Sequence, residues 1–131
     1  MKTDFRGNYL AFDLTGGEKG DAPHFPILLD LGPDIHPRAA MGDKGYDSNA
    51  NRQAARERHI VPVIPYKCTV RNKPTFFPAA LYRGRARIER SVGKLKRFKR
   101  IALRCEKTAT NFLSFVHLVA GFLLVKSVHA A

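Results

Sequence analysis

The apolar and polar positions along the chain alternate in short blocks, which predicts short strands separated by helices. Short apolar runs bounded by glycine or proline are typical of strands. Three such runs occur, at residues 8–17, 38–43 and 60–65. The first enters a glycine turn, the second ends at Asp43, and the third is interrupted by prolines, which predicts a short strand or one near a sheet edge. Residues 66–80 form a loop rich in lysine and proline.

Longer stretches with a helical spacing of apolar residues lie between and after these strands. A short helix is expected after Asp21, and another is expected after a cap at Asp47 or Ser48. Two more helices are predicted near the carboxyl end, at residues 81–103 and 109–128. Strands that alternate with helices indicate an α/β core with the late helices packed on it.

The last helix contains the most apolar part of the chain, residues 111–125. These 15 residues are fewer than the roughly 18–20 that span a bilayer. We therefore expect a buried core helix, and no membrane partner.

Composition points to a single domain and to an anionic partner. A chain of 131 residues suits one domain, and 23 Lys and Arg against 11 Asp and Glu give a net charge of +12. Such an excess favours nucleic acid or an anionic membrane surface, although evenly spread charge would only aid solubility. Cys68 and Cys105 are far apart and form neither a zinc motif nor a disulfide framework, which indicates reduced thiols and a cytoplasmic location.

Residues 81–97, drawn as a helix at about 100° per residue, separate into three faces. The apolar face contains Leu81, Ile88, Val92 and Leu95. The basic face contains Arg83, Arg87, Arg90, Lys94 and Arg97. The third group lies between the other two and contains Tyr82, Arg85, Glu89 and Lys96. Sorted charge of this kind indicates a surface that faces phosphate, although a solvated helix face has the same pattern.

Two acidic residues are candidates for a functional role. Glu89 stands alone in a strongly basic segment, where it forms either a site or an ordinary i, i+4 pair with Arg85. Asp43 is expected at the carboxyl end of a strand, where active-site crevices of open α/β sheets form. Gly42 and Gly45 keep bulk away from Asp43, which could equally be an ordinary turn aspartate.

The spacing Tyr82, Arg85, Glu89 and Lys96 resembles the Y-(2)-R-(3)-E-(6)-K signature of DDE transposases of bacterial insertion sequences. The segment "GDKGYDS" at residues 42–48 is similar to the one that carries their second catalytic aspartate. The resemblance implies an RNase H-like fold and DNA cleavage and strand transfer that depend on Mg²⁺ or Mn²⁺. It further implies that Asp43 and Glu89 are catalytic metal ligands, and that Tyr82, Arg85 and Lys96 contact DNA near the cleaved end.

The resemblance leaves one family carboxylate without a counterpart. The family's first catalytic aspartate lies upstream of the part of the family's sequence that this chain, starting at Met1, resembles. Asp4 resembles a turn residue, and neither Asp4 nor Asp13 matches the missing aspartate. Residues 1–131 are therefore expected to be a partial DDE catalytic domain, truncated at its N-terminal strands and without the N-terminal DNA-binding region. We expect the chain alone to bind DNA without sequence preference and to cleave it poorly.

The partners implied are transposon ends and target DNA, an upstream-encoded transposase half, and a second copy of the chain, at the bacterial nucleoid. Phe76 and Phe77 could also touch DNA, because they lie in a loop among basic residues. The main alternative is a non-catalytic basic DNA-binding remnant that modulates an intact transposase. A second alternative is a membrane-surface protein built on the basic helix and the apolar terminus.

Overall fold

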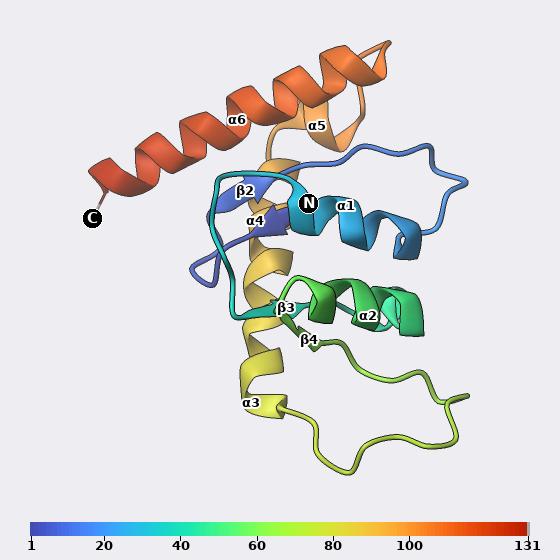
Figure 1. Cartoon of the computed structure of the whole chain (residues 1–131). Helices are drawn as coiled ribbons and strands as arrows, with labels where there is room; N and C mark the ends of the chain where they lie inside the picture. Colours follow the sequence, from blue (N-terminus) through green and yellow to red (C-terminus); the bar gives the residue numbers. More distant parts are fainter. Residues whose placement is uncertain (131) are drawn as a thin grey trace. The chain divides into compact units, whose positions relative to one another are not determined.

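The computed structural model describes residues 1–130, and Figure 1 labels their helices and strands. The chain divides into two compact units. Unit 1 consists of Met1–Leu14 and Ala86–Ala131, and unit 2 consists of Thr15–Arg85. Both units mix helices with short strands, so the chain has the α/β composition that the sequence predicts.

Unit 2 is built on a parallel pair of three-residue strands, β3 (Ala39–Met41) and β4 (Val61–Val63). The 3₁₀ turn η1 (Ala22–His24) leads into helix α1 (Phe25–Asp30), and the turn η2 (Lys44–Tyr46) precedes helix α2 (Asn49–Glu57). The crossover from β3 to β4 runs through α2, which packs on β4 and α1. The core of the unit contains Phe25, Ala55, Ile60 and Ile64.

Unit 1 joins an amino-terminal hairpin to the carboxyl-terminal helices. The hairpin consists of β1 (Lys2–Thr3) and the antiparallel strand β2 (Tyr9–Ala11). Its turn is closed by Asp4, whose carboxylate accepts hydrogen bonds from the backbone of Arg6 and from the backbone and side chain of Asn8. The helices are α4 (Ala86–Lys96), α5 (Lys99–Ala102) and α6 (Ala109–His129), whose buried residues Leu95, Ile101, Val116 and Val119 form the core.

Most of the predicted elements are present, and the strands are shorter than their apolar runs. Strand β4 has three residues, with Pro62 at its centre, and β3 ends at Met41 rather than at Asp43. Asp21 precedes η1, although its side chain makes no capping hydrogen bond. Of the two expected caps of α2, Ser48 is the one that accepts the Asn51 N–H, at 3.1 Å.

The single helix predicted over residues 81–103 is wrong. The segment is divided into α3 (Ala79–Tyr82), the 3₁₀ turn η3 (Arg83–Arg85), α4 and α5. The break between α4 and α5 is at Phe98, whose extended backbone (φ −83°, ψ 109°) places its ring in the core of unit 1. A periodic pattern cannot show such a break, because an apolar side chain suits both a helix face and a turn that points inward.

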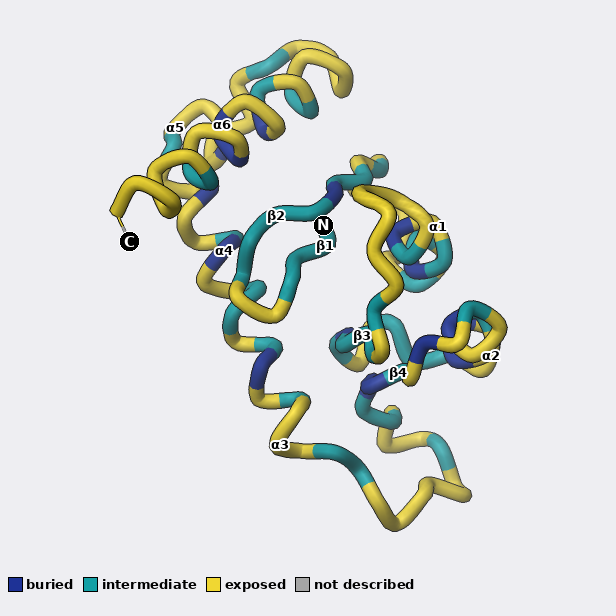
Figure 2. Tube along the Cα trace, turned by 60° about the vertical axis from the view of Figure 1, so that its left-hand side comes forward, coloured by how far each residue is buried: buried dark blue, intermediate teal, exposed yellow. Residues whose placement is uncertain are grey.

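The prediction that the last helix is a buried core helix is wrong for most of its surface. Helix α6 has 21 residues, and Figure 2 colours much of it as exposed. Its large exposed apolar residues are spaced as on one side of a helix: Leu118, Phe122, Val125 and Val128. By length and composition, α6 is the helix among residues 1–130 that is apolar enough to cross a membrane. The 15-residue count was too short because the helix continues beyond its most apolar part.

Candidate metal and DNA site

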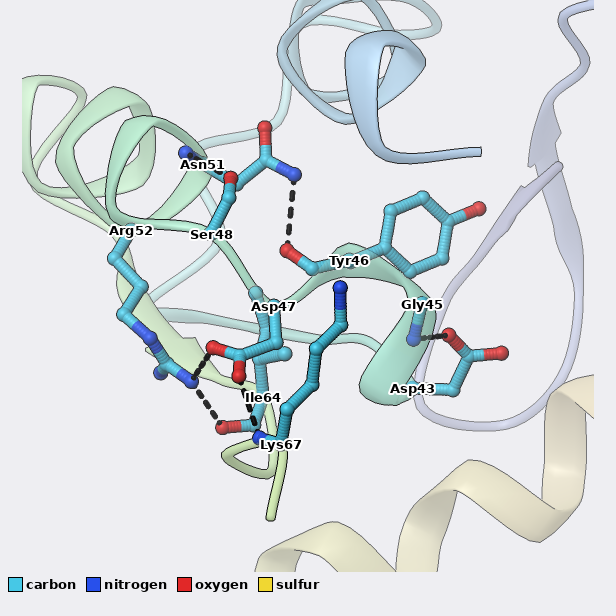
Figure 3. Close-up of polar contacts among 9 residues, drawn as sticks. All are labelled: Asp43, Gly45, Tyr46, Asp47, Ser48, Asn51, Arg52, Ile64 and Lys67. Carbon is cyan, nitrogen blue, oxygen red and sulfur yellow. Dashed lines mark hydrogen bonds and ion pairs between the residues drawn. The ribbon is translucent and has the colours of Figure 1, made fainter. Parts of the chain in front are cut away.

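Asp43 lies two residues beyond the end of β3, at the start of η2 (Figure 3). Its Oδ1 atom accepts a hydrogen bond from the Gly45 N–H at 2.8 Å. A side chain at position 45 would place its Cβ 2.9 Å from that oxygen, so glycine leaves room for the Asp43 carboxylate to fold back onto the backbone. Among residues 1–130, Oδ2 of Asp43 makes no hydrogen bond or ion pair, so that atom is available to a ligand.

The turn that carries Asp43 is fixed at its other end by a buried ion pair between Asp47 and Arg52. The Arg52 Nη2 atom lies 2.7 Å from Asp47 Oδ1 and donates to the Ile64 carbonyl at 2.9 Å. The second Asp47 oxygen accepts the Lys67 N–H at 2.6 Å (Figure 3). Both side chains of the pair are 5% exposed. Through Arg52 and the Lys67 N–H, Asp47 connects η2 to α2 and to the segment after β4.

These contacts determine the charge of Asp47. Burial alone would raise the pKa of its carboxyl group, but the Lys67 N–H and the Arg52 guanidinium outweigh burial and hold that pKa below its usual value. Sequence reasoning missed this role, since Asp47 was considered only as a helix cap. The signal that could have suggested this ion pair is Arg52, a basic residue five positions after Asp47 and inside the predicted helix.

Asn51 fixes the same turn from the other side. Its side-chain amide donates to the Tyr46 carbonyl and to the Ala22 carbonyl, each at 2.9 Å, and the residue is 3% exposed. The ring of Tyr46 packs on Phe25, with centroids 5.5 Å apart. The whole "GDKGYDS" segment is therefore held in one conformation by unit 2.

Glu89 belongs to unit 1, where it is exposed in the first turn of α4. The helix is attached to the hairpin through Ser91, which is 2% exposed. Ser91 Oγ donates to the Gly7 carbonyl at 2.6 Å, and the Tyr9 hydroxyl donates to the Ser91 carbonyl at 2.8 Å. Gly7 has φ +90°, and a Cβ there would lie 3.0 Å from Ser91 Oγ. Glycine therefore allows the close approach that fixes the helix carrying Glu89.

The three faces drawn for residues 81–97 hold only within α4, because η3 and the turn at Phe98 change the phase. Leu95 is buried, Ile88 and Val92 are half-buried, and Leu81, outside α4, is exposed. The buried face of α4 also includes Ser91, which an apolar count overlooks. The third predicted group is divided between the units, since Tyr82 and Arg85 lie in unit 2 and Lys96 in unit 1.

The predicted basic residues are mostly accessible. Arg90, Lys94 and Lys96 are exposed on α4, Arg97 is exposed just beyond it, and Arg83 is exposed in η3. Arg87 is half-buried because its guanidinium lies over the Phe5 ring, 4.2 Å from the centroid. Tyr82 and Arg85 are half-buried and near each other, with the guanidinium 5.8 Å from the ring centroid.

The donor atoms suit a hard divalent cation, but the described chain gathers too few of them for a complete site. Asp43 and Glu89 offer carboxylate oxygens, which Mg²⁺ and Mn²⁺ prefer. Among residues 1–130, no group of three or more His, Cys, Asp or Glu side chains could hold a metal ion.

Comparison with known proteins assigns the family. The model of the transposase DDE domain matches residues 1–123. The chain is 35% identical over 124 residues to the "Putative transposase for insertion sequence element IS6501" of Brucella ovis. This match covers 94% of this chain and 93% of that protein. The chain is also 33% identical over 125 residues to the "Putative transposase for insertion sequence element IS402" of Burkholderia cepacia, and that match covers 88% of this chain and 56% of that protein.

The chain belongs to the transposase DDE-domain family of insertion sequences. That family acts in DNA transposition, cleaves DNA and transfers its strands, and generally uses divalent metal ions. Its domain has an RNase H-like α/β fold. No solved structure matches the chain.

Proposed function

We propose that this chain is part of a transposase catalytic domain, with an RNase H-like core, that binds DNA through the basic face of α4. Asp43 and Glu89 are its proposed ligands for Mg²⁺ or Mn²⁺. The observation that supports this most strongly is the Asp43 turn. It is held by a buried network while Oδ2 of Asp43 keeps no partner among residues 1–130, which suits a metal ligand better than an ordinary turn aspartate.

The residues of the chain have distinct tasks in this proposal. Arg90, Lys94 and Arg97 contact phosphates, since arginine binds a phosphate through two parallel hydrogen bonds and lysine acts as a point charge. Tyr82, Arg85 and Lys96 contact DNA near the cleaved end. Asp43 and Glu89 would hold the divalent cations, which would supply activation of the attacking hydroxyl and stabilisation of the leaving oxygen.

The two carboxylates are not expected to organise two ions by themselves. We therefore propose that the isolated chain binds DNA without sequence preference and cleaves it poorly, and that another polypeptide supplies the remaining carboxylate. Transposon ends and target DNA are the proposed substrates, at the bacterial nucleoid. Metal-dependent strand transfer by the purified chain, abolished by Asp43→Ala or Glu89→Ala, would contradict the proposed incompleteness.

Fluorescence anisotropy with duplex DNA at several salt concentrations tests the DNA surface. Binding weakens as salt rises, and each phosphate contact adds about −0.9 to the slope of the log of the DNA association constant against log salt. The slope for the variant Arg90→Gln/Lys94→Gln/Arg97→Gln should therefore be less negative by about 2.7. The control Lys19→Gln/Arg38→Gln/Arg71→Gln removes the same charge from exposed positions of unit 2. Equal losses from both variants would show that only net charge matters.

A non-catalytic DNA-binding remnant that modulates an intact transposase is the second candidate, favoured by the lack of a three-ligand cluster among residues 1–130. It predicts that Glu89→Gln leaves DNA affinity unchanged or raises it, whether or not Mn²⁺ is present. The catalytic proposal predicts instead that Mn²⁺ strengthens DNA binding by the natural chain and that Glu89→Gln removes this effect.

A further inference from the structure

Unit 2 contains a cavity of about 370 Å³ beside α2, β4 and the loop that follows β4. Its volume lies within the roughly 300–1,000 Å³ that is usual for sites that bind small molecules or single chemical groups. We call it the α2–β4 cavity. It is lined by Arg52, Arg56, His59, Ile60, Val61, Pro62, Ile64, Tyr66, Pro74, Phe76, Phe77 and Pro78.

Three aromatic residues lie along the cavity. Phe76 is 79% exposed, so most of its ring is open to solvent. Phe77 is half-buried, and its ring lies edge-on to Tyr82 with centroids 5.3 Å apart. Tyr66 is held under the Arg52 guanidinium, 3.7 Å from its ring centroid. These rings offer apolar surface to a flat, apolar group.

The charged side chains that line the cavity are two arginines, Arg52 and Arg56, and among residues 1–130 no carboxylate lines it. His59 also belongs to the lining. Arg52 is 4% exposed, and its Nε is a buried nitrogen without a hydrogen-bond partner among residues 1–130. Asp47 neutralises Arg52, so the exposed Arg56 supplies the uncompensated charge. A ligand that suits this lining carries a negative charge and a hydrogen-bond acceptor.

The position of His59 follows from the end of α2. His59 has φ 57°, a left-handed conformation usually taken by glycine. The Ile60 N–H donates to the Ala55 carbonyl and the His59 N–H donates to the Arg56 carbonyl, which is the Schellman arrangement. The end of α2 thus fixes the backbone of His59 at the cavity, next in the chain to the buried Ile60.

We propose that the α2–β4 cavity binds one unpaired nucleotide of a DNA strand, with the base against Phe76 and the phosphate at Arg56. A nucleotide joins a flat ring to an anion, which is the combination that the lining suits. The base must be unpaired and unstacked because a ring face becomes available to a side chain only then. The inference rests on the proposed function for DNA as partner, but it assigns a different surface from α4.

The test uses a short single-stranded oligodeoxynucleotide that carries one 2-aminopurine, whose fluorescence is quenched when it stacks on an aromatic ring. The natural chain should quench the probe. Phe76→Ala should abolish the quenching and weaken single-strand binding about fivefold or more, and Arg56→Gln should weaken it as well. Arg71→Gln and Ile35→Ala are matched controls, because both residues are exposed in unit 2 and neither lines the cavity.

Duplex DNA, measured with the same variants, separates this inference from the proposed function. We expect Phe76→Ala to leave duplex affinity unchanged, since duplex binding is assigned to α4. Unchanged quenching by Phe76→Ala, or equal losses from the control variants, would overturn the cavity assignment and leave the α4 proposal intact. If removing the basic residues Arg90, Lys94 and Arg97 left duplex affinity unchanged while quenching still depended on Phe76, only the α4 proposal would be overturned.

A third arm separates a DNA strand from a free nucleotide. Thymidine monophosphate is added as a competitor of the probe, at the molar concentration used for an unlabelled oligonucleotide competitor. The inference predicts little competition, because a strand also contacts the rest of the basic protein. Competition as strong as that by an unlabelled oligonucleotide would show a site for free nucleotides and would overturn the assignment to DNA.

Discussion

The segments that carry Asp43 and Glu89 are fixed in different ways. The Asp43 turn is held by polar contacts within unit 2, above all the buried pair of Asp47 and Arg52. The Glu89 helix is held by apolar packing in unit 1 and by the close contact between Ser91 and Gly7. The turn thus depends on a buried ion pair, whereas the helix depends on apolar packing and on hydrogen bonds between uncharged groups.

The two units also differ in charge. Unit 1 has 12 Lys and Arg against 4 Asp and Glu, whereas unit 2 has 11 against 7. Most of the excess positive charge of unit 1 therefore lies in the segment that contains α4, as expected if α4 provides the phosphate-binding surface. Unit 2 has the smaller net charge, +4 against +8 for unit 1.

The largest effect is expected from Asp47→Ala. The change leaves the buried guanidinium of Arg52 without its anion, which costs about 3–5 kcal/mol. Hydrogen exchange should rise in peptides from residues 39–67 and remain unchanged in residues 86–102. Asp34→Ala, at a side chain that is 97% exposed, is the control and should change neither. Unchanged exchange in residues 39–67 would show that the buried pair does not fix the turn.

Gly7→Ala should destabilise unit 1 by about 1–3 kcal/mol, because alanine is strained at φ +90° and its Cβ crowds Ser91 Oγ. The matched change within α4 is Gly93→Ala, since no atom lies within 4 Å of an added Cβ there. That variant should be stabilised by about 0.5–1 kcal/mol. Effects of the same sign in thermal unfolding would contradict the proposed role of the Gly7 contact.

The two helix caps provide a matched pair with smaller effects. Ser48 accepts the Asn51 N–H at 3.1 Å, and Thr108 accepts the Asn111 N–H at 3.2 Å. Replacing either by alanine should cost about 1 kcal/mol. Hydrogen exchange should show Ser48→Ala loosening only α2 and Thr108→Ala loosening only α6. Loosening of both helices by one change would contradict their separate stabilisation.

The smallest effect is expected from acid, because burial partly opposes the shift at Asp47. Its pKa is lower in the folded chain than in the unfolded chain, so the pair contributes stability above about pH 4 that is lost as pH falls further. Exchange in residues 39–67 should therefore rise below about pH 4 more steeply in the natural chain than in Asp47→Asn. Equal pH profiles would contradict a lowered pKa.

The sequence predicts the parts of this molecule that depend on local pattern. The Ser48 cap, the extent of α6 and the turn at Asp43 follow from residue types at fixed spacings. The ion pair of Asp47 and Arg52 and the contact of Ser91 with Gly7 could not be predicted, since they join segments through burial and close approach. The break at Phe98 was missed for a related reason, because tertiary packing there overrides the helical period.

Asp43 and Glu89 are both proposed as metal ligands, and a double-mutant cycle on Mn²⁺ affinity tests this proposal. Electron paramagnetic resonance would measure free Mn²⁺ for the natural chain, Asp43→Asn, Glu89→Gln and the double variant, each with duplex DNA present. If both carboxylates bind the metal, each single change should weaken Mn²⁺ binding. The double change should then lose less binding free energy than the sum of the two single losses. Strictly additive losses, or no loss from either change, would contradict this proposal.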